Sequence, residues 1–357
     1  MNSNKTFIIA EIGTSHGGDI NKAIKLIHSA AECGADCAKF QVVYADEILH
    51  KNTGEVKLPG GNIPLYTVFK NLEMDLDFYK ILKEETEKVG LVFMASPFGE
   101  RSAKLLNDIN SEIFKVASPE LNHLPLLKQI VSYKKPIILS SGVSKLEDIE
   151  RALEITGTET VTLLHCITSY PAPEEDYNLQ LIKNLHNIFG IDTGISDHSL
   201  DPILVPSMSV LLGAKVVEKH ITLLNTSDGL DDPVALNPIN FKKMCESIRE
   251  YENLDLNIGL EKLSKIYGKE RIDSILGSGI KKLAPSEIDN YGRTNRSLHA
   301  LEKLNVGDLI SEENTALLRT EKVLRPGLPP YLVNSVYGKK VKREIPSGEG
   351  VRLEDLL

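Results

Sequence analysis

Three stretches near the middle of the chain decide the fold: VTLLHCI (161–167), DTGISDH (192–198) and KVVEKHI (215–221). Each is a short run of strand-forming residues, and a helical stretch, DPILVPSMSVLLGA (201–214), separates the last two. Strands that alternate with helices are typical of parallel βαβ units. The three runs therefore predict a parallel sheet that is covered by helices.

The same alternation extends back to the N-terminus. Five further strands are predicted, at 7–13, 37–43, 91–97, 113–118 and 135–142. Between the first two lies NKAIKLIHSAAECG (21–34), which gathers its apolar residues on one helical face and stops at Gly34. Eight βα units predict a closed (β/α)8 TIM barrel. The alternative is an open doubly wound sheet, but no GxGxxG or GxxxxGK[ST] motif follows any of these strands.

The pattern changes after the last predicted barrel strand. We predict a barrel domain at 1–260, a linker at 261–284 and a small β-rich domain at 285–357. The small domain contains short strands, turns and a proline-rich stretch. A theme occurs in it twice, as LNVGDLISEENTALL (304–318) and IPSGEGVRLEDLL (345–357). Each copy places apolar residues on both sides of a glycine turn and continues into a short acidic helix.

Composition excludes several classes of protein. The 357 residues carry a formal net charge of −9, which argues against a uniformly basic nucleic-acid-binding surface. No apolar run approaches the ~18 residues of a membrane span, and the polar N-terminus does not resemble a signal peptide. The four cysteines, which show no CxxC spacing, are expected to be reduced thiols. We therefore expect a cytoplasmic protein that binds neither nucleic acid nor membrane.

Polar residues interrupt the predicted strands near their C-terminal ends, where a TIM barrel carries its active site. A charge in a buried strand is costly unless it has a partner or a function. Ammonium and hydroxyl donors of this kind could together bind an anion that carries phosphate and carboxylate groups. They are Lys39, Ser96, Lys115, Ser118 and Ser196. The simpler alternative is that each lysine snorkels or pairs with a carboxylate.

Two histidines end the last two predicted strands. His198 and His220 would converge over the mouth of the barrel, and Asp231 follows in the next loop. Two neutral imidazoles, completed by water or substrate oxygens, make an open site for a divalent cation. The alternative is that each histidine is a structural residue with its hydrogen bonds satisfied.

Several motifs, in order along the chain, resemble the sialic acid synthase family with its legionaminic and pseudaminic acid synthase relatives. They are IAEIGTSHGGD, AKFQ, FKVASPE, PIILSSG, LLHCITSYPAPEEDYNL, GISDHS and EKHITL. Residues 285–350 resemble the SAF domain of that family, which is similar to type III antifreeze proteins. The resemblance covers nearly the whole chain.

The resemblance implies a transferase that condenses phosphoenolpyruvate with an open-chain N-acylated hexosamine. The products would be a nine-carbon 2-keto sugar acid and phosphate, with Mn²⁺ or Mg²⁺ as cofactor. It also implies a domain-swapped homodimer. The sugar stays open among N-acetylmannosamine, its 6-phosphate and di-N-acetylated acceptors, so legionaminic and pseudaminic acid synthesis remain alternatives.

The resemblance also implies roles for individual residues. Phosphoenolpyruvate positions match Lys39, Ser96, Lys115, Ser118, Thr168 and Ser196, and the metal ligands match His198 and His220. Acceptor-sugar positions match Glu11, Asn62, Glu120, Tyr170 and Asp231. Glu11, Glu120 and Tyr170 are the expected catalytic residues, and Glu11 or Glu120 would activate water. An arginine that the small domain sends into the partner's site matches Arg296, with Arg293 as a close alternative.

Asp232 departs from the family pattern near the presumed acceptor, where it would contact the sugar or only cap its loop.

One competing hypothesis is a class I aldolase that forms a Schiff base through Lys39 or Lys115. Another is a phosphoenolpyruvate-condensing barrel that makes a shorter keto acid. The last is a non-catalytic carbohydrate-binding or ice-binding protein.

Overall fold

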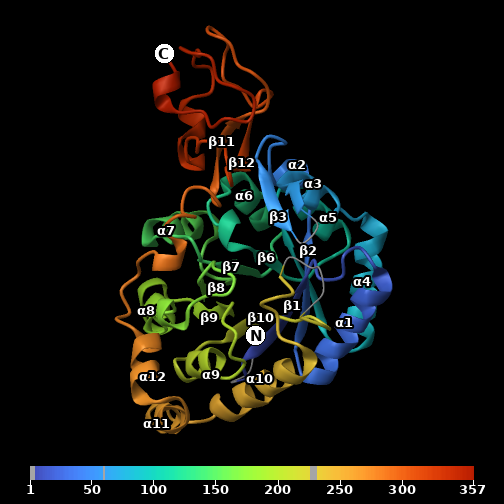
Figure 1. Ribbon diagram of the computed structural model, residues 1–357, viewed down its shortest axis with the longest axis vertical. Coiled ribbons are helices and arrows are strands. Elements are labelled where there is room, and N and C mark those ends of the chain that lie inside the picture. Colours follow the sequence, from blue (N-terminus) through green and yellow to red (C-terminus); the bar gives the residue numbers. More distant parts are fainter. Residues whose placement is uncertain (1–4, 59–60, 226–230) are drawn as a thin grey trace.

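The computed structural model describes residues 5–58, 61–225 and 231–357, and its larger part is a closed barrel (Figure 1). Eight parallel strands form the barrel within these residues: β1 (Phe7–Gly13), β2 (Cys37–Val42), β5 (Val92–Pro97), β6 (Phe114–Val116), β7 (Ile137–Ser140), β8 (Val161–Cys166), β9 (Asp192–Asp197) and β10 (Val216–His220). Strand β1 pairs with both β2 and β10, which closes the ring. The predicted TIM barrel is confirmed.

Helices surround the barrel. They are α1 (Ile20–Cys33), α4 (Leu76–Lys88), α5 (Glu100–Asp108), α6 (Leu124–Ser132), α7 (Leu146–Thr156), α8 (Gln180–Phe189), α9 (Leu204–Leu211) and α10 (Pro238–Tyr251). Helix α1 shows how the sequence sets their ends. The carboxylate of Asp19 accepts from the first backbone N–H groups, and Gly34 ends the helix in the left-handed conformation that glycine favours.

An insertion lies between β2 and α4. It consists of α2 (Ala45–Ile48), the hairpin of β3 (Glu55–Leu58) and β4 (Gly61–Pro64), and α3 (Leu65–Lys70). The insertion reaches the small domain, since Leu49 forms a bridge with Arg319. It therefore builds part of the surface on which the small domain sits.

Two more helices, α11 (Leu256–Tyr267) and α12 (Lys269–Leu276), follow the barrel and cover most of the predicted linker. Helix α11 packs on α9, and α12 packs on the short helix η2 (Glu174–Asp176). Among the described residues, no helix combines the length and the apolar character that crossing a bilayer requires.

The small domain stands at one end of the barrel (Figure 1). Its strands β11 (Arg296–Ala300) and β12 (Thr315–Arg319) are antiparallel, and η4 (Pro330–Ser335) and η5 (Leu353–Asp355) complete it. The two copies of the repeated theme meet, because Leu304 and Ile345, the first residue of each, exchange both backbone hydrogen bonds. Both side chains belong to the domain's own hydrophobic core.

Candidate functional site

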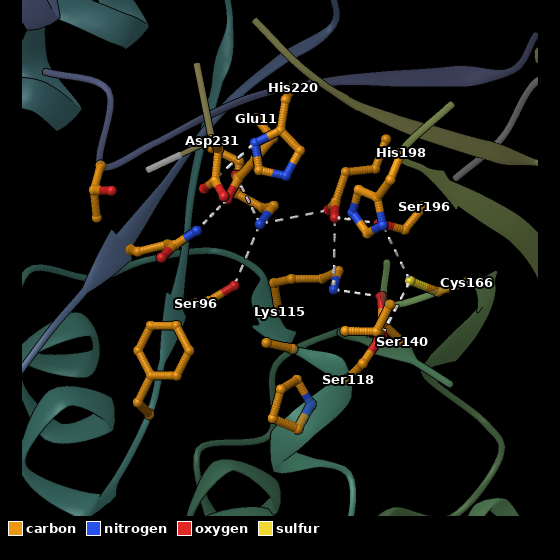
Figure 2. A pocket seen from close by; sticks show the side chains of 18 of the residues that line it. Glu11, Ser96, Lys115, Ser118, Ser140, Cys166, Ser196, His198, His220 and Asp231 are labelled. Carbon is orange, nitrogen blue, oxygen red and sulfur yellow. Dashed lines mark hydrogen bonds and ion pairs between the residues drawn. The ribbon is translucent and has the colours of Figure 1, made fainter. Parts of the chain in front are cut away.

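A cavity of about 220 Å³ opens at the C-terminal ends of the barrel strands (Figure 2). Most of the residues predicted from the sequence line it: Glu11, Lys39, Ser96, Lys115, Ser118, Thr168, Tyr170, Ser196, His198, His220 and Asp231. They come from six barrel strands, from loops that follow these strands and from the loop after β8. The fold therefore gathers in one place residues that lie up to 220 positions apart in the sequence.

Strand alternation decides which side chains reach the cavity. Successive residues of a strand point to opposite faces, so Glu218 and His220 of β10 point inward and Lys219 points away. On the outer side Lys219 pairs with Asp197 of β9, with 2.6 Å between Nζ and Oδ2. Of three consecutive charged or polar residues, only the first and third belong to the site.

Two lysines and two glutamates form a buried charge network at the base of the cavity. The Nζ of Lys39 lies 2.7 Å from Oε2 of Glu11 and 3.5 Å from Oε2 of Glu218. The Nζ of Lys115 lies 3.8 Å from Oε1 of Glu218. All four side chains are almost completely buried. The lysines are thus paired with carboxylates and also line the cavity, which combines the two interpretations of their sequence positions.

Hydroxyl groups complete this end of the site. Lys115 donates to Ser140 Oγ at 2.6 Å, and Lys39 donates to Ser96 Oγ at 3.4 Å. Ser196 donates to Glu218 Oε1 at 2.9 Å. Figure 2 shows Ser96, Lys115, Ser140 and Ser196 around a common space. Ammonium and hydroxyl donors around one cavity suit a ligand that carries several negative oxygens.

The network shifts the pKa values of its members in different directions. Burial raises the pKa of Glu11 to about 7, against the influence of Lys39 and with a further contribution from Glu218. Burial also opposes ionisation of Glu218, but Lys115 and Lys39 together lower its pKa. Burial lowers the pKa of Lys115. Glu11 is therefore a carboxyl group that can exchange a proton near neutral pH, and burial raises the pKa of Asp231 in the same cavity as well.

The two histidines lie side by side at the other end of the cavity. Their ring centroids are 5.5 Å apart, and the ring of Tyr170 lies 4.2 Å from that of His198. The Nδ1 of His198 donates to the carbonyl oxygen of Ile167 at 2.7 Å, so in the neutral ring the lone pair is on Nε2. The Nδ1 of His220 lies 3.7 Å from Oδ2 of Asp231.

These residues fit a divalent cation that takes part of its shell from other oxygens. The buried Nδ1 of His220 has no hydrogen-bond partner within the described chain. The described residues also contain no group of three or more histidine, cysteine, aspartate or glutamate side chains that could hold a metal ion. Burial lowers the pKa of His198, but Cys166 and the Ile167 carbonyl raise it to about 9. A cation would therefore have to compete with a proton at this ring.

Three of the predicted site residues lie outside the cavity. Glu120 is fully buried beside it, where it accepts from Arg296 Nε and from Arg319 Nη2 at 2.6 Å. Arg296 also donates to the carbonyl oxygens of Phe98 and Glu47. Asn62 is exposed in the β3–β4 hairpin. Within the chain, Glu120 and Arg296 thus join the small domain to the barrel.

The two residues whose roles stayed open have clear contacts. Arg293, the alternative to Arg296, donates to the carbonyl oxygen of Glu321 inside the small domain. Asp232 is fully buried and accepts from Ser15 Oγ at 2.5 Å, away from the lining of the cavity. Its contact favours the interpretation that Asp232 holds its loop.

Sequence reasoning assigned no role in the site to several residues that line the cavity: Gln41, Ser140, Cys166, Glu218 and Arg319. Glu218 precedes the predicted ligand His220 by two residues, so strand alternation alone would have placed it in the site. Arg319 belongs to the small domain. Its presence in the cavity depends on how that domain docks, and no local pattern reports that.

Comparisons with known proteins agree with this architecture. The NeuB family matches residues 26–258, and the SAF domain matches residues 295–357. N,N'-diacetyllegionaminic acid synthase of Campylobacter jejuni is 36% identical over 324 residues, which are 88% of this chain and 90% of that protein. The crystal structure of the spore coat polysaccharide biosynthesis protein spsE of Bacillus subtilis has a TM-score of 0.82 at 32% identity, over 99% of this chain and 95% of the other.

A second solved structure is also similar. It is N-acetylneuraminic acid (sialic acid) synthetase of Leptospira borgpetersenii in complex with citrate, with a TM-score of 0.64 at 30% identity. The match covers 75% of this chain and 94% of that one.

Proposed function

This chain belongs to the NeuB family of enzymes, and from that premise we propose that it condenses phosphoenolpyruvate with an open-chain N-acylated hexosamine. The products are a nine-carbon 2-keto sugar acid and phosphate. The observation that carries the proposal is the pair Lys39 and Lys115, two buried ammonium groups that line one cavity together with hydroxyl donors. An anion with both phosphate and carboxylate groups matches such a donor set.

Phosphoenolpyruvate occupies the end of the cavity that contains the lysines. Ser96, Ser118, Thr168 and Ser196 line the same cavity and supply further donors. Glu11 and Glu218 already neutralise the lysines, so the ligand competes with them for the ammonium groups. Displacing these carboxylates from the lysines costs part of the binding energy. The site therefore favours a ligand of high charge over a simple carboxylate.

The acceptor sugar occupies the end that contains the histidines, beside Tyr170 and Asp231. His198 and His220 would hold a divalent cation, Mn²⁺ or Mg²⁺, and the buried Nδ1 of His220, which has no hydrogen-bond partner among the described residues, supports this assignment. When bound, such a cation supplies a Lewis acid that polarises the aldehyde oxygen of the acceptor. The two substrates then lie in one cavity, and their mutual orientation provides much of the rate gain.

The bond changes follow from the chemistry of phosphoenolpyruvate. Its carbon 3 forms a bond to the aldehyde carbon, the aldehyde oxygen takes up a proton, and positive charge develops at carbon 2. Water adds to carbon 2, and Glu11 accepts the proton of that water, a role that a pKa of about 7 suits. The bond between carbon 2 and the phosphate oxygen then breaks, the new hydroxyl group on carbon 2 loses its proton to become the keto group, and phosphate is released.

The test is phosphate release from phosphoenolpyruvate with Mn²⁺, with mass spectrometry of the product. The acceptors are N-acetylmannosamine, its 6-phosphate and di-N-acetylated 6-deoxyhexoses. We expect a nine-carbon keto acid from one of them, which also identifies the branch of the family. If none of these acceptors stimulates phosphate release, the proposed function is wrong.

The domain-swapped homodimer stays a prediction. Its test measures the oligomeric state together with the activity. Arg319 lines the cavity of its own chain. Sedimentation at decreasing concentration, with specific activity measured on the same samples, decides the point. Full activity in a monomer would exclude any need for a partner's arginine.

A further inference from the structure

The segment that connects the barrel to the small domain is docked on the barrel. Residues 277–295 leave α12, pass α8 and α7 and enter β11 (Figure 1). In α8, Asn184 donates to the carbonyl oxygen of Gly279 at 2.8 Å. Lys281 Nζ donates to the carbonyl oxygen of Ser141 at 3.2 Å, and Asn295 Nδ2 donates to that of Val143 at 3.1 Å. Lys281 and Asn295, from the two halves of the segment, therefore both bind the loop after β7.

Glu287 is the last residue of the short helix η3 (Pro285–Glu287), which lies within this segment. Its side chain is completely buried. Oε1 accepts the backbone N–H groups of Val143 and Thr168, each at 2.7 Å, and Oε2 accepts that of Ala284 at 3.3 Å. Val143 follows β7 and Thr168 follows β8, so a single carboxylate oxygen ties two active-site loops together.

The loop after β8 carries Thr168, whose side chain lines the cavity, and the loop after β7 contacts Ser118, which also lines it. Gly142 N donates to Ser118 Oγ at 3.0 Å, and a Cβ at Gly142 would lie only 2.1 Å from Thr168 Oγ1. The backbone at Gly142 therefore packs directly against Thr168. Ser118 and Thr168 both line the cavity, close to Lys115. A shift of either loop moves hydroxyl groups at the anion-binding end of the site.

We infer that Glu287 is a positioning residue for that end of the site: through the backbone N–H groups of Val143 and Thr168 it fixes the hydroxyls that bind phosphoenolpyruvate. The identity of the anion rests on the proposed function, whereas the positioning of the loops does not. Glu287 itself does not line the cavity. The same segment leads into the small domain, so the placement of that domain and the geometry of the anion site are joined at this carboxylate.

The role requires an acceptor of this length. In Glu287→Gln the amide oxygen can still accept both N–H groups, but the NH₂ group then faces the N–H of Ala284, and the charge is lost. In Glu287→Ala no acceptor remains for either loop. We therefore expect the anion site to be best ordered with glutamate at position 287, less well ordered with glutamine and least well ordered with alanine. Asp289→Asn is the matched control, since Asp289 is exposed on the same segment.

Steady-state kinetics give the first readout. We expect the KM for phosphoenolpyruvate to rise about tenfold to a hundredfold in Glu287→Ala, because hydrogen bonds to a charged acceptor are lost at two amides. The KM for the acceptor and kcat change much less, Glu287→Gln falls between, and Asp289→Asn matches wild type. A purely structural role would lower the melting temperature and the active fraction and leave this KM unchanged.

Amide hydrogen exchange gives a second readout that needs no substrate. We expect the amides of Val143 and Thr168 to exchange at least tenfold faster in Glu287→Ala, while the amides of β11 keep their rates. Unchanged exchange at both amides would overturn the inference. If the wild-type chain does not turn over phosphoenolpyruvate, the proposed function fails, and the exchange rates still decide whether Glu287 holds these loops.

Discussion

At the residue scale, Glu11 controls the protonation of the site. Burial raises its pKa from 4.5 to about 7, so between these pH values the native state binds a proton that the unfolded chain has released. The stability contributed by the protonated group is complete below pH 4.5 and is lost as pH rises through about 7. In Glu11→Gln the side chain does not titrate, so the variant does not lose this stability as the pH rises. We expect wild type to lose up to roughly 3 kcal/mol relative to the variant across the interval.

Urea unfolding of both proteins from pH 4.5 to 8.5 measures this difference. The two free energies of unfolding should diverge up to about pH 7 and run parallel above it. Parallel curves over the whole range would show that Glu11 is ionised throughout and is not the group that titrates near neutral pH.

Lys115 tests the anion site directly. Lys115→Met leaves Glu218 with one fewer buried partner, so we expect a loss of roughly 3–5 kcal/mol of stability along with phosphoenolpyruvate binding. Adding Glu218→Gln removes the unpaired charge, so the double variant should recover much of the stability but not the binding. Calorimetric titration with phosphoenolpyruvate measures the affinity. Binding by the double variant at wild-type affinity would contradict the assignment of Lys115.

At the element scale, the alternation along β10 separates site from scaffold. Lys219 is as deeply buried as Lys115, but it pairs with Asp197 outside the cavity. We expect Lys219→Met to lower stability by roughly 3–5 kcal/mol and to leave the KM for phosphoenolpyruvate unchanged in the folded fraction. A KM raised as in Lys115→Met would mean that burial, rather than the direction of the side chain, decides which lysine binds the anion.

Sequence patterns predict the barrel strands well because each strand carries its own signal. The runs at 161–167 and 215–221 become β8 and β10 with only their ends trimmed. The region between β2 and α4 is different, since no element was predicted where α2, α3 and the β3–β4 hairpin lie. These elements are short, and their partners, such as Arg319 opposite Leu49, are far away in the sequence.

At the scale of the whole molecule, the buried carboxylate of Glu120 in the barrel binds two arginines of the small domain. Burial would raise the pKa of Glu120, but Arg296 and Arg319 hold it well below its usual range. The stability from this group is present above pH 4.5 and is lost as pH falls toward the lowered pKa. At pH 7 we expect Glu120→Gln to lose roughly 3–5 kcal/mol, because two buried guanidinium groups lose their counter-charge.

Limited proteolysis reports where that stability is lost. We expect cleavage in residues 277–295 to become faster in Glu120→Gln than in wild type, as the small domain separates from the barrel. Unchanged proteolysis and stability would mean that other contacts hold the domains together. The sequence predicts that a small domain exists, since its repeated theme is local. It does not predict how the domain docks, since Glu120 and Arg319 are paired only in three dimensions.

The proposed reaction requires that phosphate leaves by cleavage of the bond between carbon 2 and oxygen. Phosphoenolpyruvate labelled with ¹⁸O in the oxygen that bridges carbon 2 and phosphorus tests this directly, with mass spectrometry of both products. We predict that the label appears in the released phosphate and that the new keto acid takes its oxygen from water. Label retained in the organic product, with unlabelled phosphate, would contradict the account. It would mean hydrolysis at phosphorus followed by an aldol reaction of pyruvate.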